Sequence, residues 1–495
     1  MKKDIYADRF LSLYKAMGMS MIASVTETVT QTFTLGLFLI KPRIVIHTGS
    51  LVKCLFLSVG FNLNQATSNL TKAQKKVLIL SSLGGVLEFF DFIIYMFLVP
   101  YIEKLFFTTG SSFVTTLKTL AVFSAGYLIR PLGGMIFSHF GDRYGRKVVF
   151  LLTVLFMAVP SFAIGILPTT AQIGMFAPML LLILRLMQGL AIGGEIPAAM
   201  TFISEHVAKQ RLGFAMAVLF FGINIGLLMG SLAAFLLTTY FTEQEILAYA
   251  WRIPFILGGF FGIGAIVLRR HLQETAAFKS LTQEEKPAIP LLDLVRGYYP
   301  QVLQGVCLVA LASVCLFMYL YWPTYLHKYL NYDFSKVTHL NTLGILMLCF
   351  AIVLGGLISD RFGHIKVYFT CVIGMLVVAY PIYLLFGTGK MPLVYTSYFL
   401  FTLLFGIFPS CYGAILPQMF PTAIRYSGVA LSYNLSFALF SGFSPVVCTL
   451  LIEWTNNVFA PAWYMMLVAC ITGLACYYGY ARQKKASFCQ LSAFQ

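Results

Sequence analysis

The sequence predicts an all-α polytopic membrane protein, with twelve transmembrane helices in two pseudo-symmetric halves of six. Three observations predict this fold. Hydrophobic residues make up 59% of the chain and charged residues only 11%, against about 25% charged residues in soluble domains. Apolar runs of about 20 residues, long enough to cross a ~30 Å hydrocarbon layer, recur along the chain. A charged turn, Ser138–Lys147, returns as Gly356–Lys366 at the matching place in the second half.

The apolar runs divide the chain into five parts. Residues 1–76 contain no convincing span and no secretory signal, and are either a disordered or interfacial extension or the product of a mis-assigned start. Residues 77–268 form the first six-helix bundle, 269–299 a cytoplasmic linker, 300–480 the second bundle and 481–495 a cytoplasmic tail. The predicted spans are 77–100, 112–138, 148–167, 176–198, 212–240, 250–268, 300–326, 337–358, 367–388, 392–411, 424–452 and 458–480.

The basic residues indicate the orientation. Most loop lysines and arginines fall on one side, so both termini are expected in the cytoplasm and the protein in the inner (cytoplasmic) membrane of a bacterium. The net charge of +16 forms no continuous stripe, which argues against nucleic-acid binding. The ten cysteines lie mostly in apolar runs, without metal-ligand spacing, and predict neither a metal site nor a disulfide framework. Of the loop lysines and arginines, the loops on the outer side of the membrane hold only Lys104, Lys118, Lys328, Lys336 and Lys390.

A few charged residues fall at membrane depth, where each costs roughly 2.5–3.5 kcal/mol and usually faces a wet cavity or a partner. Helical spacing places Asp91 and Tyr95 on one face of the first span, and Asp91 at the depth of Arg185. We expect a pair between Asp91 and Arg185, with a second pair between Arg130 and Glu195 below it. Such pairs either couple proton movement to transport or only hold the helices together. The charged residues at depth are Glu88, Asp91, Arg130, Arg185 and Glu195.

Polar and aromatic residues supply further candidates. Gln188 lies on the fourth span near Arg185. Tyr321, Trp322 and Tyr325 crowd the outer part of the seventh span; they are either a membrane-interface belt or the wall of a cavity that holds an ammonium group. Further polar groups that would shape a substrate site in the second half are Tyr319, Thr324, Tyr412, Ser432, Tyr433 and Asn434.

The charged turns themselves predict a gate. An acidic residue lies just past a helix end in each turn, with basic residues close by, and recurrence in both halves argues against chance. Such a network can latch the cytoplasmic ends of the spans together while the cavity faces outward. The alternative is that the turns are topology signals only. The predicted gate residues are Asp142, Arg143, Arg146, Asp360 and Arg361.

At these motifs the chain resembles the major facilitator superfamily, and within it the metabolite:proton symporters related to proline/betaine, α-ketoglutarate, citrate and shikimate permeases. Four stretches between about 72 and 480 carry the resemblance in order. Departures leave the substrate open: Gly85, Phe89 and Phe90 stand where the branch has Asn, Trp and Tyr. Ser138 and Ala423 replace a turn glycine and an arginine. The four stretches are Gly84–Phe92 (GGVLEFFDF), Leu128–Gly134 (LIRPLGG), Leu186–Glu195 (LMQGLAIGGE) and Met419–Gly428 (MFPTAIRYSG).

The resemblance implies proton-driven uptake of a small organic acid or zwitterion by alternating access, without a cofactor other than the proton gradient. It implies that Asp91, Glu88 and Glu195 serve the proton, and that Arg130 and Arg185 contact the substrate or balance the acids. Expected partners are the substrate, protons and the lipid bilayer, with the protein a monomer. The alternatives are an osmoregulatory compatible-solute permease and a transporter-like sensor that moves nothing. A membrane enzyme is disfavoured, since no nucleophile elbow or phosphate-binding loop is present.

Overall fold

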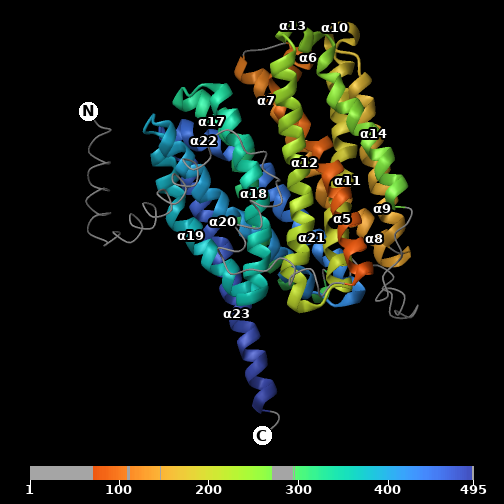
Figure 1. Cartoon of the computed structure of the whole chain (residues 1–495), viewed down its shortest axis with the longest axis vertical. Helices are drawn as coiled ribbons and strands as arrows, with labels where there is room; N and C mark the ends of the chain where they lie inside the picture. Colours follow the sequence, from red (N-terminus) through yellow and green to blue (C-terminus); the bar gives the residue numbers. More distant parts are fainter. Residues whose placement is uncertain (1–70, 109–111, 145, 270–293, 295, 493–495) are drawn as a thin grey trace, which may run out of the picture. The chain divides into compact units, whose positions relative to one another are not determined.

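The computed structural model describes residues 71–108, 112–144, 146–269, 294 and 296–492, and every regular element within them is helical (Figure 1). Nine described segments are long and apolar enough to span a membrane. Among the described residues there is a tenth segment if Glu243–Ala250 and Arg252–Val267, two helices bent by 41° at a short break, are taken as one span. The helix at Lys72–Phe97 and the apolar stretch Leu151–Ile166 cover the two remaining predicted positions. The predicted all-helical, twelve-span fold is thereby confirmed.

The N-terminal half places its six predicted spans on long helices that are joined by short elements. The spans coincide with α5 (Lys72–Phe97), α7 (Ser112–Leu128) with α8 (Arg130–Tyr144), α9 (Arg146–Ile166), α11 (Phe176–His206), α12 (Leu212–Tyr240) and α14 (Arg252–Arg269). The short elements are α6 (Val99–Phe106), α10 (Thr170–Ile173), η1 (Lys209–Arg211), α13 (Glu243–Glu245) and η2 (Ile246–Ala250).

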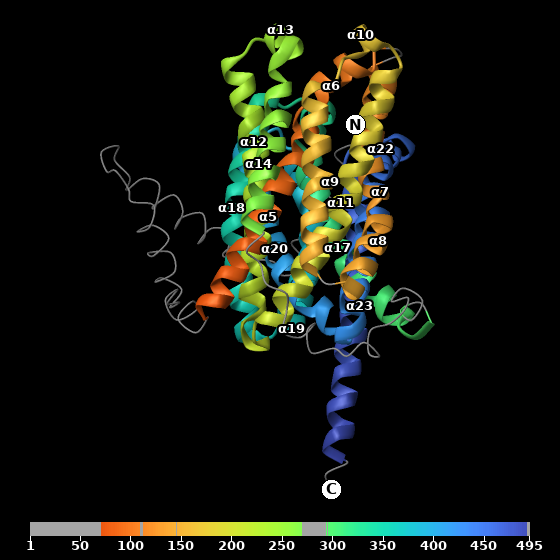
Figure 2. The same cartoon turned by 90° about the vertical axis from the view of Figure 1, so that its right-hand side faces the viewer.

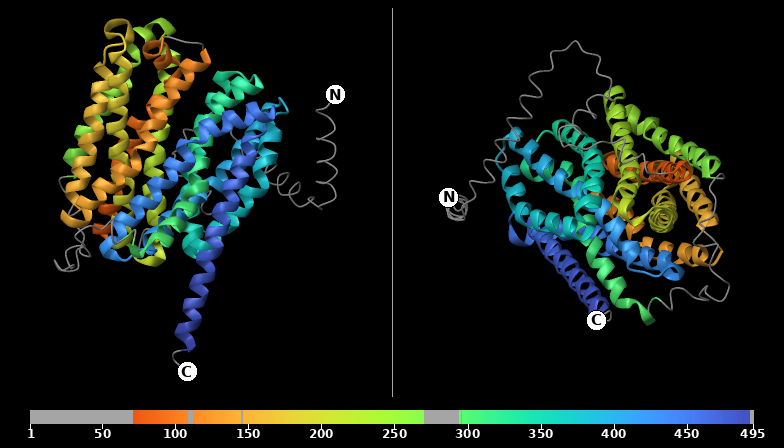
Figure 3. Two further views of the ribbon diagram at one scale, coloured as in Figure 1. Left: turned by 180° about the vertical axis from the view of Figure 1, so that it is seen from behind. Right: turned by 60° about the horizontal axis from the view of Figure 1, so that its bottom comes forward.

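The C-terminal half repeats this plan. Its helices are α17 (Tyr299–Leu330), α18 (Phe334–Phe362), α19 (His364–Phe386), α20 (Met391–Gln418), η3 (Thr422–Ile424), α21 (Arg425–Ser436), η4 (Phe437–Gly442), α22 (Ser444–Thr455) and α23 (Pro461–Ser492). α23 continues past the other helices at one end, opposite the end that carries α10 and α13 (Figures 1 and 2). The left panel of Figure 3 shows the bundle from behind, and the right panel turns the end from which α23 projects toward the viewer.

Two predicted spans are bent rather than straight. The span at 112–138 breaks at Ile129, because Pro131 has no N–H group and cannot bond the carbonyl of Tyr127. The span at 424–452 contains η4, a π-helical turn between α21 and α22. The two breaks are neighbours: a Cβ atom on Gly442 would lie 3.6 Å from the side chains of Tyr127 and Leu128. π-Turns of this kind often mark functional sites.

Close helix packing inside the N-terminal half uses glycine. A Cβ atom on Gly226 of α12 would lie 2.2 Å from the carbonyl oxygen of Val86 on α5, so only glycine fits there. Between the halves, α12 packs on α18 and α20, while α8 and α11 pack on α21. Figures 1 and 2 show α12 and α18 side by side. Two seams therefore join the halves.

Parts of the predicted domain plan lie outside the described residues. These are the extension up to residue 70, the linker residues 270–293 and 295, and residues 493–495. The boundaries proposed there stay predictions.

Candidate functional site

Arg185 is fully buried within the N-terminal half and has polar partners. Its Nη1 donates a hydrogen bond to Oε1 of Gln188 at 2.8 Å, and its Nη2 donates to the carbonyl oxygen of Phe92 at 3.0 Å. The guanidinium carbon lies 4.3 Å from the ring centroid of Tyr95 and 4.6 Å from that of Phe92, distances typical of cation–π contact. Tyr95 also donates its hydroxyl to the carbonyl oxygen of Thr119 on α7 at 3.1 Å. Arg185 is thus held from two helices, α5 and α11.

Asp91 lies beside this arginine without a direct ion pair. Its side chain is 2% exposed, and its Oδ1 faces Gly258 of α14, where an added Cβ atom would lie 1.7 Å away. Its Oδ1 has no hydrogen-bond partner among the described residues, and the positive charge of Arg185 acts on the carboxylate through space. Ser161 Oγ accepts a hydrogen bond from Nε2 of Gln188 at 2.7 Å. The expected direct pair of Asp91 and Arg185 is wrong: Nη1 and Nη2 of the guanidinium donate to Gln188 and to the carbonyl of Phe92, and its Nε has no partner among the described residues.

Arg130 stands in contrast at the first turn of α8. It is fully buried, and none of its three side-chain nitrogens has a hydrogen-bond partner among the described residues. Three aromatic rings surround it instead. Its guanidinium carbon lies 5.1 Å from the ring centroid of Tyr127, 5.6 Å from that of Tyr433 and 4.9 Å from that of Phe437. Tyr433 and Phe437 belong to the C-terminal half, so Arg130 lies where the two halves meet.

The expected pair of Arg130 and Glu195 does not form. Glu195 is buried and accepts a hydrogen bond from Oγ1 of Thr153 on α9 at 2.6 Å. The bend after Ile129 directs Arg130 toward the C-terminal half, whereas Glu195 turns toward α9 within its own half. Glu88 lies on α5, but its side chain is outside the described residues.

Side chains of the C-terminal half complete the surroundings of Arg130. The ring of Tyr412 packs against Tyr433 at 6.3 Å between centroids and against Phe220 of α12 at 5.3 Å. Asn434 donates a hydrogen bond across the halves to the carbonyl oxygen of Gly193 at 2.6 Å. The sequence analysis named Tyr412, Tyr433 and Asn434 as polar groups of this half but did not connect them to Arg130.

Residues that the sequence analysis missed are Tyr127, Phe437 and Ser161. Phe437 follows Tyr433 by four residues and so shares its helix face, a pattern that a search for aromatic pairs near a buried arginine would have found. Tyr127 precedes Arg130 by three residues. Ser161 carried no comparable signal, because single serines in apolar helices are common and its neighbours come from other spans.

The two charged turns share one pattern of hydrogen bonds. Asp360 of α18 accepts hydrogen bonds from the N–H groups of Gly213 at 2.7 Å and Phe214 at 2.9 Å in the first turn of α12. Asp142 of α8 accepts from the N–H of Ser427 at 3.1 Å and from its Oγ at 2.7 Å in the first turn of α21. Each carboxylate therefore caps the N-terminus of a helix in the other half, where the helix dipole favours negative charge.

The arginines of the turns contribute differently from the prediction. Arg361 is exposed, lies over the ring of Phe362 at 5.5 Å, and takes no part in the latch in this structure. The side chains of Arg143 and Arg146 lie outside the described residues. An ion pair does join the halves at this end, with Nη1 of Arg425 3.3 Å from Oε1 of Glu205.

The aromatic residues of the seventh span pack inside the C-terminal half. Nε1 of Trp322 donates to the hydroxyl of Tyr383 at 3.1 Å, and Tyr325 donates its hydroxyl to the carbonyl oxygen of Val458 at 2.6 Å. Both side chains are fully buried, so a lipid-facing belt is wrong for them. Their packing against the same half also leaves them no described contact with Arg130. The ring of Tyr321 stacks on that of Phe317, with 5.5 Å between centroids, and its substrate role stays a prediction.

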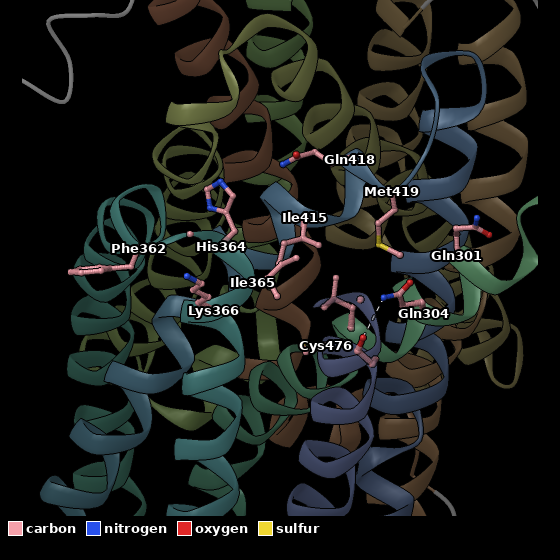
Figure 4. Close-up of a pocket in the computed structure, with 14 residues that line it drawn as sticks. Gln301, Gln304, Phe362, His364, Ile365, Lys366, Ile415, Gln418, Met419 and Cys476 are labelled. Carbon is pink, nitrogen blue, oxygen red and sulfur yellow. Dashed lines mark hydrogen bonds between the residues drawn. The ribbon is translucent and has the colours of Figure 1, made fainter. Parts of the chain in front are cut away.

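A cavity of about 680 Å³ opens elsewhere, at the charged-turn end of the C-terminal half (Figure 4). Its wall is formed by residues between Gln301 and Gly479, including Gln304, His364 and Lys366. None of these belongs to the N-terminal half or to the predicted substrate and proton residues. The cavity is thus separate from the two arginines, whose surroundings are closed in this conformation.

Comparison with known proteins decides the family. Residues 81–445 match the model of the Major Facilitator Superfamily. The chain belongs to the Major Facilitator Superfamily. It is therefore a transporter-family protein that resides in a membrane.

Relatives and solved structures agree with this assignment. The glycine betaine/proline/ectoine/pipecolic acid transporter OusA of Dickeya dadantii is 32% identical over 414 residues, covering 81% of this chain and 82% of the relative. The proline/betaine transporter of Escherichia coli K12 is 33% identical over 408 residues, covering 80% and 81%. The proton:xylose symporter XylE bound to 6-bromo-6-deoxy-D-glucose matches with a TM-score of 0.69 at 14% identity, covering 82% of this chain and 95% of that one. At that identity the likeness shows the fold.

Proposed function

We propose that this superfamily member is a proton-coupled symporter that carries a small zwitterionic carboxylate inward by alternating access. The observation that carries the proposal is Arg130, a buried guanidinium without a hydrogen-bond partner among the described residues, at the plane between the halves. Uncompensated buried charge is costly, and cation–π contacts offset only part of that cost. A substrate carboxylate would supply the missing acceptors in a bidentate geometry.

The rings around Arg130 extend the proposal to the other end of the substrate. Tyr127 lies in the N-terminal half, whereas Tyr433 and Phe437 lie in the C-terminal half. An ammonium group is attracted to aromatic faces. A zwitterion bound to Arg130 and to these rings would therefore touch both halves, and could favour the conformation in which they close around it.

Proton coupling is proposed for the Asp91 region. Asp91 is a buried acid next to Arg185, and its charge is balanced by that arginine through space rather than by a direct pair. Protonation of Asp91 would change how firmly Arg185 is held. Because proton and substrate would then each alter the affinity for the other, the gradient could drive uptake.

The orientation follows from the basic loops. We place the charged-turn end in the cytoplasm, with both termini on that side and the protein in a bacterial inner membrane. The caps formed by Asp142 and Asp360 then close the cytoplasmic side. We further propose a monomer that needs no cofactor beyond the proton gradient.

A compatible-solute permease is the form of this function that the relatives favour. Two transporters named for betaine and proline cover about four fifths of the chain at 32% and 33% identity. Such a permease would raise its uptake rate when external osmolality rises. Equal rates at low and high osmolality would leave zwitterion transport in place and remove the osmoregulatory role.

The deciding experiment is uptake by the purified full chain in proteoliposomes. The panel is labelled glycine betaine, proline, α-ketoglutarate, citrate and shikimate, each with an imposed proton gradient and with a protonophore. We expect accumulation of betaine or proline that the protonophore abolishes. Accumulation that ignores the protonophore would contradict symport, and counterflow of none of the five would contradict the substrate class.

A further inference from the structure

One hydrogen bond between the halves lies beside the rings that surround Arg130. Nδ2 of Asn434 on α21 donates to the carbonyl oxygen of Gly193 on α11 at 2.6 Å, and to that of Ala430 in its own helix at 2.8 Å. Both acceptors are carbonyl oxygens, so this nitrogen is correctly the NH₂ group of the amide. The side chain is fully buried, and its Oδ1 has no partner among the described residues. Asn434 therefore serves this contact as a donor.

The carbonyl of Gly193 needs a donor because of a proline. In an α-helix it would accept a hydrogen bond from the N–H group four residues later, and that residue is Pro197, inside α11. Proline has no N–H group, so the helical hydrogen bond cannot form. Gly193 is buried, and a buried carbonyl without a donor is costly. Asn434 supplies from the other half the donor that α11 lacks at this position.

Two glycines make room for the amide of Asn434. A Cβ atom on Gly134 of α8 would lie 2.6 Å from Nδ2 of Asn434 and 3.2 Å from the carbonyl oxygen of Gly193. A Cβ atom on Gly193 would lie 2.3 Å from the carbonyl oxygen of Arg130, so α8 and α11 approach closely here. The two glycines leave a notch between these helices, and the side chain of Asn434 inserts into it. A methyl group at position 134 would fill this notch.

A second hydrogen bond between α21 and α11 differs in one respect. Tyr426 donates its hydroxyl to the carbonyl oxygen of Gly194 at 2.8 Å. That carbonyl has a helical donor, the N–H group of Ala198, whether or not the halves are in contact. The carbonyl of Gly193 has no such donor. It depends on Asn434 while the halves are in contact, and on water once they separate.

We propose that Asn434 is a positioning residue for alternating access, which holds α21 against α11 by donating to the carbonyl that Pro197 leaves without a helical donor. Tyr433 and Phe437 adjoin Asn434 in the sequence, and their rings lie beside the guanidinium of Arg130. The same hydrogen bond therefore keeps these rings at the arginine while the halves are in contact. The proposal rests on the proposed function, in which the halves separate around Arg130.

Separation of the halves then exchanges one donor for another. Water that enters between α21 and α11 donates to the carbonyl of Gly193 in place of Asn434, and the amide keeps its bond to Ala430. The rings of Tyr433 and Phe437 move away from Arg130 together with α21. Because water can satisfy the carbonyl in the open state, the hydrogen bond of Asn434 favours contact without preventing separation.

Hydrogen–deuterium exchange of the reconstituted full chain tests this role without any substrate. We expect Asn434→Ala to speed the exchange of peptides from α21 about tenfold, because the closed contact then contains a carbonyl without a donor and opens more often. Pro197→Ala restores a helical N–H group for that carbonyl. In the Pro197→Ala background, Asn434→Ala should therefore speed exchange by no more than about twofold.

The double variant makes the test specific to the carbonyl of Gly193. A general loss of packing at Asn434 would speed exchange equally in both backgrounds. Unchanged exchange in Asn434→Ala overturns the proposal, and so does the same tenfold increase in the presence and in the absence of Pro197.

Transport measurements test the consequence at the substrate site. With betaine as probe, Asn434→Ala should raise KM about fivefold, because the rings are held less firmly beside Arg130, and Pro197→Ala should reverse that rise. The matched control is Asn224→Ala, a buried asparagine of α12 whose Nδ2 donates to the carbonyl of Phe220 in its own helix at 2.8 Å. It should change neither KM nor the exchange of α21. A rise in KM that Pro197→Ala does not reverse contradicts the positioning role.

Two further results keep the proposals separable. If Asn434→Ala does not fold, Gly134→Ala takes its place, because its methyl group displaces the amide from the notch. It should speed the exchange of α21 in the same way, and wild-type exchange in that variant overturns the proposal. If the wild-type protein shows no gradient-driven accumulation, or Asp91→Asn keeps it in full, the proposed function fails. The role of Asn434 in holding the halves together is still decided by the exchange rates.

Discussion

Two fully buried arginines of one half have opposite surroundings. Arg185 is hydrogen-bonded to Gln188 and to the backbone of Phe92, all within the N-terminal half. Arg130 has rings around it but no hydrogen bond among the described residues, and two of the rings come from the other half. A partnered charge belongs to the internal machinery of its half. Arg130 lacks acceptors where the halves meet, and in the proposed function a substrate carboxylate supplies them.

The largest expected effect tests whether Arg130 binds the substrate carboxylate. Arg130→Gln should lower the uptake rate about 100-fold, corresponding to ~3 kcal/mol, because the substrate carboxylate loses its charged donors. Its free energy of unfolding should change by less than about 1 kcal/mol, since no protein hydrogen bond is removed. Uptake and thermal unfolding in detergent measure the two effects. Arg130→Lys is the matched control and should keep part of the uptake, as it retains charge without the planar fork. Unchanged uptake by Arg130→Gln would refute the ligand role.

The second prediction distinguishes the Asp91 region from the Arg130 region by two activities, gradient-driven accumulation and counterflow. Asp91→Asn should lose gradient-driven accumulation and retain counterflow, because it affects the proton and leaves Arg130 and its rings in place. Both activities are measured in the same proteoliposomes. Asp333→Asn, an exposed acid that caps α18, serves as control and should keep accumulation. If Asp91→Asn accumulates substrate as the wild type does, the assignment of proton coupling to this region is wrong.

The third prediction concerns stability. Arg185→Gln should lower the free energy of unfolding by about 3 kcal/mol, because the buried carbonyl of Phe92 loses its charged donor and Asp91 loses its balancing charge. Denaturant titration of the purified proteins measures how far the free energy of unfolding of Arg185→Gln lies below that of Arg130→Gln. Equal losses in the two variants would remove the distinction between a partnered and an open arginine.

The smallest expected effect tests whether the ring of Phe437, beside Arg130, contributes to substrate binding. Phe437→Leu should raise KM about threefold, as expected from the loss of one cation–π contact of ~0.5–1 kcal/mol. Phe443→Leu, an exposed side chain six residues further on, is the matched control. A threefold rise in both variants would point to a general effect on this part of the chain rather than to the rings around Arg130.

The sequence predicted properties that depend on neighbouring residues along the chain better than contacts between different helices. Span length, apolar composition and the repeated charged turn are local properties, and they predicted the helices at their positions. The same reasoning placed Asp91 and Arg185 at one depth, and both are buried side by side. It failed for their direct contact and for the pair of Arg130 and Glu195, because depth along a helix says little about which neighbour a side chain faces.

The gate shows the same division. The repeated acids predicted a latch, and the structure places Asp142 and Asp360 at the N-termini of α21 and α12 across the halves. Three of the four hydrogen bonds come from backbone N–H groups, which carry no residue identity and so leave no mark in the sequence; the fourth comes from the hydroxyl of Ser427. Arg361, predicted because a charge favours a counter-charge nearby, is exposed and lies over the ring of Phe362 instead.

The sequence by itself determined that this chain folds as twelve membrane-spanning helices in two halves, because the hydrocarbon layer accepts only long apolar segments with internally satisfied backbones. It also predicted the burial of Asp91, Arg130, Arg185 and Glu195. Tertiary structure alone decided that Arg185 is bound by its neighbours and Arg130 is not. That outcome depends on the bend at Ile129, the π-turn at Phe437 and the packing of α21 against α8, which bring together residues from both ends of the chain.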